Sequence, residues 1–342
     1  MDTDGLERII VSLGMFIIDD FQFHDDDDQP TGKILPPQES SCLLAAEVVL
    51  LPAEAVGMIV DRGNDFPGSI QKQLDALGHH AWLFRDNNER VTTRALNSYK
   101  GDRRGFQYTT PRIRLTPRDL IGSDFQRPKM LHFICSPTRA ATIVSEIKDE
   151  DGWNPITIYE PIPDRCIPEE LPALINVLPS ISVLSPNAEE ALSLLSIPGP
   201  PTKTLVEEAC GRLLQLGVGP QGEGVVVIRS GALGAFVASK GREGTWVPAF
   251  WNGDEDLKHV VDVTGAGNGF LGGMAAGLHI TGGDTYEATL YGTISSSFII
   301  EQEGLPHLTQ RSDTIGHLGE YWNGDLPHRR LKVLQDRLQK VT

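Results

Sequence analysis

The sequence predicts an α/β fold built around a largely parallel sheet, with one small β lid. Short apolar runs alternate with segments of helical periodicity along most of the 342 residues, which is typical of successive βαβ units. A hydrophobic fraction of 40% with 22% charged residues suffices to build a buried core. No long linker and no repeat divides the chain, so we expect residues 1–342 to form a single domain.

The predicted strands are apolar runs rich in β-branched residues, and the predicted helices carry apolar residues three or four positions apart. We expect strands at residues 9–14, 55–60, 80–84, 129–135, 156–160, 181–185 and 224–230. We expect helices at residues 67–78, 138–149, 169–178, 187–195, 203–217, 266–280 and 284–302. The last residues, DRLQKVT, are expected to be the fraying end of a further helix.

Two regions interrupt this alternation. Residues 88–116 contain two extended segments joined by a polar turn, which predicts an antiparallel flap on the main sheet that serves as a lid. Residues 15–36 are a second candidate lid segment. Residues 22–54 are polar, interrupted by prolines and fit neither period, so we assign no structure to them.

The charge balance bears on partners and location. The formal net charge is −16 and the pI is about 5.0, which argues against direct nucleic-acid binding, because phosphate contacts require clustered Lys and Arg. No apolar run reaches the ~18 residues of a membrane span, and the N-terminus carries acids where a signal peptide carries bases. Four cysteines without metal-ligand spacing fit a reducing compartment. We therefore expect a cytoplasmic protein, with the nucleus as an alternative, and no membrane partner.

The stretch VVDVTGAGNGFLGG, residues 260–273, carries the strongest chemical signal. Glycines that open a helix let backbone amides approach an anion, and the helix dipole favours negative charge there. A tight helix start packed on a sheet is the structural alternative. The loop is no P-loop, because no Lys-Ser or Lys-Thr follows the glycines. Its match to a dinucleotide fingerprint would need Glu287 at a strand end, but Glu287 lies in a predicted helix.

Four further polar residues have both a structural and a functional interpretation. Asn187 and Glu190 have the spacing of a helix capping box, which is compatible with a role at a metal. Asp19 closes an apolar strand, where carboxylates form turns but also bind ligands in α/β sheets. His132 lies in an apolar run and is interpreted as a packed side chain.

Taken together and in order, these motifs resemble the PfkB/ribokinase family of carbohydrate and nucleoside kinases. VDVTGAGNGF resembles the family's C-terminal signature, SPNAEEAL its NxxE motif, and VVVIRSGALGAFV its nucleotide-binding strand and turn. IIVSLGMFIID resembles the first strand, and VGMIVDRGNDFPG the second strand with its acidic turn. The sequences VDVTGAGN and VDRGNDFP together most resemble a fungal branch of this family. That branch includes a yeast protein needed to maintain the killer double-stranded RNA virus.

The resemblance implies a ribokinase-like three-layer sandwich with a mostly parallel central sheet and a small β lid. It also implies ATP and Mg²⁺ as cofactors and a sugar or nucleoside as substrate. The residues it assigns are, for substrate, Asp19 with Gly14; for the transferring phosphate, Gly265, Ala266 and Gly267; for nucleotide, Asn187, Arg229, Gly231, Gly234 and Thr264; and for magnesium, through water, Glu190.

Two departures affect the catalytic layer. Asn268 stands where the family has the Asp that accepts the substrate's proton, and an amide cannot accept it. Residues 33–47, KILPPQESSCLLAAE, occupy the place of the family's Gly-Gly motif and contain none. This leaves two interpretations open for the second departure, altered substrate recognition or a gene-model error. In the nucleotide layer, Arg229 replaces the usual Thr.

Two functions therefore remain as expectations. The first is an ATP-dependent phosphotransferase acting on a sugar or nucleoside hydroxyl and weakened by Asn268. The second is a pseudokinase, a nucleotide-binding or structural protein that acts through a protein partner. The resemblance also makes a homodimer through the lid possible.

Overall fold

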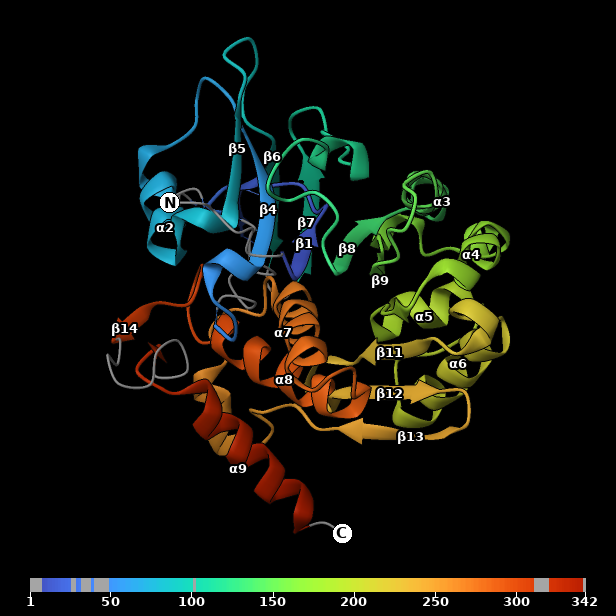
Figure 1. The fold of residues 1–342 in the computed structure, drawn as a ribbon. Coiled ribbons are helices and arrows are strands. Elements are labelled where there is room, and N and C mark those ends of the chain that lie inside the picture. Colours follow the sequence, from blue (N-terminus) through green and yellow to red (C-terminus); the bar gives the residue numbers. More distant parts are fainter. Residues whose placement is uncertain are drawn as a thin grey trace.

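Three layers make up the main body of the protein, with a sheet between two groups of helices (Figure 1). The computed structural model describes residues 8–25, 29–31, 38–39, 49–100, 103–310 and 320–340. Within these residues the main sheet has nine strands in the order β13-β12-β11-β10-β9-β8-β1-β4-β5. Their bounds are β1 (Ile10–Ser12), β4 (Val56–Arg62), β5 (Trp82–Asp86), β8 (Met130–Cys135), β9 (Ile156–Pro161), β10 (Val183–Leu184), β11 (Val225–Arg229), β12 (Ala235–Ser239) and β13 (Arg242–Val247).

The sheet is parallel from β5 to β11 and ends in the antiparallel strands β12 and β13. Side chains that alternate along its strands enter two separate cores, as Ile10 and Val11 do on β1. One face carries α2 (Gly68–Leu77), α7 (Ala266–Ile280), α8 (Thr285–Ile299) and α9 (Pro327–Gln339). The other carries α3 (Pro137–Lys148), α4 (Leu171–Val177), α5 (Ala188–Leu194) and α6 (Lys203–Gln215). This confirms the predicted fold class.

A second, four-stranded sheet in the order β3-β2-β6-β7 forms the lid. Its strands are β2 (Ile18–His24), β3 (Gln38–Glu39), β6 (Arg94–Lys100) and β7 (Arg103–Tyr108). β6 and β7 are antiparallel, as expected, but β6 pairs on its other side with β2 in parallel. The predicted flap is therefore part of a separate sheet and does not extend the main one. Much of the segment 22–54, which we left unassigned, lies outside the described residues.

The acidic turn after β4 connects this lid to the main body. Arg94, the first residue of β6, donates to Asp65 at 2.9 Å and to Asp20 of β2 at 3.2 Å. Asp65 also accepts the backbone N–H of Thr92 at 2.7 Å, and these hydrogen bonds hold the pKa of its carboxyl below the usual value although burial opposes them. The same arginine thus joins β2 and β6 of the lid to the acidic turn.

Some predicted boundaries were wrong. β5 begins two residues later than expected, because His79–Ala81 form a 3-10 turn. The hairpin of β12 and β13 was missed, because β13 is a largely exposed edge strand without a regular apolar pattern. Only the end of α9 was expected, although the helix begins at Pro327, and the small sheet of β14 (Leu308–Gln310) and β15 (Tyr321–Trp322) was not predicted.

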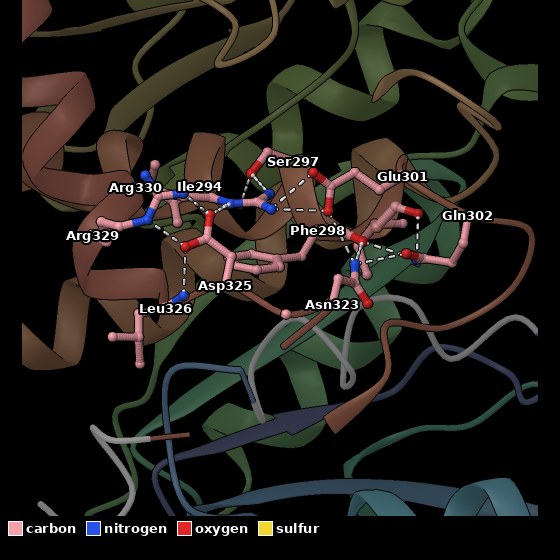
Figure 2. Close-up of polar contacts among 12 residues, drawn as sticks. Ile294, Ser297, Phe298, Glu301, Gln302, Asn323, Asp325, Leu326, Arg329 and Arg330 are labelled. Atoms are coloured by element: carbon pink, nitrogen blue, oxygen red, sulfur yellow. Dashed lines mark hydrogen bonds and ion pairs between the residues drawn. The ribbon is translucent and has the colours of Figure 1, made fainter. Parts of the chain in front are cut away.

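Helix α9 is joined to α8 through a buried arginine (Figure 2). The guanidinium of Arg330, on a residue only 3% exposed, donates to Ser297 at 2.8 Å, to Glu301 at 2.8 Å and to Asp325 at 2.9 Å. Its centre lies 3.7 Å from the ring centroid of Phe298. Two carboxylates and an aromatic face therefore surround this charge. Separately, within the described part of the chain no helix has the length and apolar composition to cross a membrane.

Candidate functional site

A cleft opens where the strand order of the main sheet reverses. The chain leaves β1 towards β4 and β5 on one side, and later places β8 and β9 on the other side. In open α/β sheets, ligands bind in the crevice outside the carboxyl ends of the strands at such a point. Here the crevice has a volume of about 1730 Å³, and lid strands, strand ends and the start of α7 all line it.

The start of α7 presents free backbone amides to this cleft. Gly265 precedes the helix with φ 79°, a left-handed conformation that suits glycine, and no side chain caps the helix. The first helical hydrogen bond joins Gly269 N to Gly265 O at 2.8 Å. Among the described residues the amides of Gly267 and Asn268 have no backbone acceptor. Free amides at a helix start are what an anion site needs, and Gly265, Ala266 and Gly267 all line the cleft, while the N–H of Ala266 itself donates to Val263 O at 3.1 Å. Anion binding at these residues stays a prediction.

Two later glycines of this motif serve packing. A Cβ on Gly269 would lie 2.6 Å from Ile299, and one on Gly273 would overlap Ser295, both residues of α8. Close approach of α7 to α8 requires these glycines. The structural alternative for the motif, a tightly packed helix, is thus correct for its second half, while the anion interpretation of its first half stays a prediction.

Asn268 lies in the first turn of α7 and is half-buried at the cleft wall. Thr264 precedes that turn, and its backbone N–H donates to Asp262 at 2.8 Å. The hydroxyl of Tyr99, from the lid strand β6, lies 3.5 Å from Thr264 Oγ1. The lid therefore reaches the loop that leads into α7.

Asp19 also lines the cleft and belongs to the lid. It was expected at the end of a main-sheet strand, but it lies within β2, because residues 13–17 leave the main sheet after β1. Its carboxylate is buried and accepts a hydrogen bond from Asn97 Nδ2 at 2.9 Å. Gly14 lies in the link between the strands, and its N–H donates to Ser12 Oγ at 3.0 Å. Asp19 and Gly14 both line the cleft.

A buried ionic cluster forms the floor of the cleft. Arg229 ends β11, and its Nη2 donates to Glu160 Oε1 at 2.7 Å and lies 3.8 Å from Glu190 Oε2. Glu160 Oε2 lies 3.6 Å from His132 Nε2, and His132 Nδ1 shares a hydrogen bond of 3.0 Å with Ser12 Oγ. The cluster connects the ends of β1, β8, β9 and β11 across the sheet.

The pKa values of two carboxylates in this cluster are shifted in opposite directions. Burial raises the pKa of Glu190 to about 7, although Arg229 and the backbone of Asn187 oppose that shift. The pKa of Glu160 is lowered instead, because Arg229 and His132 together outweigh its burial. Glu160 therefore remains ionised at neutral pH, and the proton of Glu190 is exchangeable in that range.

Glu160, His132 and Ser12 were not predicted as site residues, and His132 was interpreted only as a packed side chain. His132 is indeed buried, yet it lines the cleft together with Ser12 and Glu160. The available signal was a polar residue inside or at the end of an apolar strand run. That signal becomes specific only when the topology brings the three strands together.

The remaining predicted residues also lie at the cleft. Asn187 and Glu190 form a reciprocal capping box at the start of α5, with hydrogen bonds of 2.7 and 2.8 Å. Gly231 and Gly234 have positive φ in the turn after β11, and Gly234 packs against the backbone of Val247. The structural interpretation of the Asn187–Glu190 pair is therefore correct, and any metal role would add to it.

The donor set argues against a cation held by protein ligands alone. Within the described residues no group of three or more His, Cys, Asp or Glu side chains converges on a point. Glu190 Oε2 is already engaged by the backbone of Asn187. A magnesium ion that keeps its water and is carried by a nucleotide needs fewer protein ligands. The residues present fit such an ion.

Comparison with known proteins gives matches over the whole chain. The pfkB family of carbohydrate kinases matches residues 136–310. Protein MAK32 of Saccharomyces cerevisiae is 31% identical, covering 97% of this chain and 93% of its own. An uncharacterized protein of Schizosaccharomyces pombe is 30% identical, covering 97% of this chain and 94% of its own.

Solved structures show the same fold at lower identity. The ribokinase of Arabidopsis thaliana, complexed with ribose and ATP, superposes with a TM-score of 0.65 at 18% identity, covering 96% of this chain and 99% of that one. A ribokinase II from E. coli, in complex with ATP and Mg²⁺, has a TM-score of 0.63 at 19% identity, with coverages of 96% and 99%. These likenesses concern the fold alone.

Proposed function

Because the chain belongs to the pfkB family of carbohydrate kinases, we propose that it transfers a phosphoryl group from ATP to a hydroxyl of a sugar or nucleoside. One observation supports this most. The uncapped, glycine-rich start of α7 and the buried carboxylate of Asp19 line the same cleft. A phosphate site and a hydroxyl-binding carboxylate are the two elements that such a transfer requires.

Each group has a defined task in this proposal. Asp19 accepts hydrogen bonds from acceptor hydroxyls, with its orientation fixed by Asn97. The amides of Gly267 and Asn268 stabilise negative charge on the phosphoryl group. Bound magnesium supplies charge neutralisation on the phosphates, and Glu190 is placed to orient its water. Arg229, Gly231 and Gly234 line the cleft beside the nucleotide.

Proton removal limits the rate. As the acceptor oxygen bonds to the γ-phosphorus, the bond to the bridging oxygen of ADP breaks, and the acceptor's proton must leave. Asn268 cannot take it, so the proton passes to solvent. Loss of a general base typically costs 10²–10⁴ in rate, while positioning and charge stabilisation remain. We therefore expect slow turnover.

Nucleotide binding is the first test. Saturating Mg·ATP at about 100 times its dissociation constant should stabilise the fold by about 2.7 kcal/mol, measured by thermal unfolding and confirmed by calorimetry. The absence of any shift at millimolar ATP and ADP would contradict the proposal.

The second test restores the base. Asn268→Asp should raise turnover of at least one sugar or nucleoside by roughly 10²-fold or more, in an assay of ADP release. Asn268→Ala is the matched control, because it alters the same side chain without adding a base, and it should not exceed the wild type. Equal activity of both variants across the acceptor panel would contradict a kinase function.

A second candidate is favoured by Asn268 itself. In a pseudokinase the cleft binds nucleotide without transfer, and a protein partner senses the bound state. Nucleotide binding in the wild type, combined with no turnover in Asn268→Asp, would favour this function. The net charge of −16 makes a basic protein surface a better partner than nucleic acid.

A further inference from the structure

The guanidinium of Arg229 touches the first turn of α7. A Cβ built on Gly267 would overlap Arg229 Nη1. Glycine at this position therefore makes room for the arginine as well as exposing a backbone amide. A positive charge thus lies directly beside the amides of Gly267 and Asn268, at the place where the proposed phosphate binds.

Only one terminal nitrogen of Arg229, Nη2, is held by neighbouring groups among the described residues. Its Nη2 donates to Glu160 at 2.7 Å and to the backbone oxygen of Ser185 at 3.1 Å. Its side chain is 11% exposed, and its Nε is buried without a hydrogen-bond partner. Nη1, which faces Gly267, has no hydrogen bond among the described residues. Of the five N–H donors of a guanidinium, the two on Nη1 are therefore left for a ligand.

A purely structural counter-ion would be arranged differently. To neutralise Glu160 and Glu190, the arginine would direct both of its terminal nitrogens to the carboxylates, as bidentate pairs do. Here one nitrogen serves Glu160, while Glu190 Oε2 stays at 3.8 Å and is bonded to Asn187. The other terminal nitrogen is directed to the helix start.

We infer that Arg229 is a catalytic residue of the proposed transfer, which donates through Nη1 to the oxygens of the phosphate bound at the start of α7. This inference rests on the proposed function. The family resemblance places a neutral Thr at this position, so the charge is a property of this chain. A fixed guanidinium stabilises the charge of the transferring group.

The test measures anion binding without catalysis. Inorganic pyrophosphate and adenosine are each titrated by calorimetry into wild type and into Arg229→Gln. Loss of a charge-assisted hydrogen bond should weaken pyrophosphate by about tenfold or more. Adenosine carries no phosphate, so its affinity for the variant should stay within about twofold of its affinity for the wild type. Smaller differences are not interpreted.

Removing the arginine alone leaves Glu160 buried and unpaired, so a second variant is needed. Arg229→Gln with Glu160→Gln removes both charges and should show the same loss of pyrophosphate affinity. Glu160→Gln alone keeps the guanidinium and should bind pyrophosphate at least as tightly as the wild type. Thermal unfolding of each variant reports whether it is folded.

The outcomes separate the two claims. Pyrophosphate affinity of the folded double variant equal to that of the wild type would overturn the role of Arg229. A parallel loss of pyrophosphate and adenosine affinity would overturn it too, because it indicates a structural role. If the wild type binds neither pyrophosphate nor ADP nor ATP, the proposed function itself fails.

Discussion

At the scale of single residues, the two carboxylates beside Arg229 behave as an unequal pair. Glu160 is bonded to the guanidinium and keeps its charge, while Glu190 is bonded to backbone and is easily protonated. Environments that push two neighbouring pKa values apart are typical of functional sites. Their separation makes the folded state respond to pH.

The first prediction concerns Glu190. The pKa of Glu190 is about 7 in the folded state and 4.5 in an unfolded chain. As pH rises, the unfolded state therefore loses this proton at a lower pH than the folded state. The contribution of Glu190 to the free energy of unfolding is fully present below about pH 4.5 and is lost as pH rises through about 7. The total loss is on the order of 3 kcal/mol. Glu190→Gln keeps the capping box and removes the titration. Chemical unfolding at pH 5.5 and 7.5 should therefore show a smaller difference in this variant.

The control is Glu189→Gln, which alters the exposed neighbour on the same helix and should change that difference only slightly, because Glu189 is the smallest of the causes that act on the pKa of Glu190. A wild-type protein equally stable at both pH values, with no change in either variant, would contradict the prediction.

The second prediction tests the contact of Gly267 with Arg229. Alanine here overlaps Nη1, and although the arginine is flexible, moving it separates it from the buried Glu160. Gly267→Ala should lower the free energy of unfolding by about 1–3 kcal/mol. Gly211→Ala, in α6 with no atom near the added methyl, should instead raise it by about 0.5–1 kcal/mol. Equal effects of both substitutions in urea unfolding would show that the contact is unimportant.

At the scale of elements, α9 depends on one side chain. Arg330→Met removes the guanidinium, so Glu301 and Asp325 each lose a charged hydrogen-bond donor. Breaking a buried ion pair in this way typically costs about 3–5 kcal/mol. We expect that loss in the free energy of unfolding, with increased hydrogen exchange in α9.

Its control is the neighbouring arginine. Arg329 is 63% exposed and pairs with Asp325 at the surface, so Arg329→Gln should cost less than about 1 kcal/mol. A loss as large as that of Arg330→Met would mean that the cluster acts through Asp325 alone.

Elements with a strong pattern were predictable, and elements defined by their environment were not. The buried strands β4, β8, β9 and β11 and helices α6, α7 and α8 have clear periodicity, and the structure places them where expected within a few residues. β2 was missed because it pairs with β6, which is distant in sequence, and β13 was missed because it is a largely exposed edge strand without a regular apolar pattern.

The same holds for the site. Motif residues such as Gly265, Asn187 and Glu190 could be named from the sequence because their local spacing carries the signal. The cluster of Glu160, His132 and Ser12 could not, since each comes from a different strand. The place of Arg229 against Gly267 also depends on two segments far apart in the chain.

At the scale of the whole molecule, the excess of acids is the dominant property. A net charge of −16 opposes the compact state through self-repulsion. Raising NaCl from about 0.01 M to 0.15 M shortens the Debye length from about 30 Å to about 8 Å, so the midpoint of thermal unfolding at pH 7.5 should rise. Near the pI of about 5.0 this effect should disappear. An identical rise at both pH values would assign it to something other than net charge.

The short link between β1 and β2 has one more consequence. Five residues, 13–17, join β1 of the main sheet to β2 of the lid, and Ser12 at their start belongs to the ionic cluster through His132. A displacement of the lid is therefore transmitted to the cluster that holds Arg229. If the proposed function holds, mutations that adapt the lid to a new acceptor alter the proposed phosphate site as well. During divergence the two halves of the cleft must change together, so a new specificity evolves through paired substitutions.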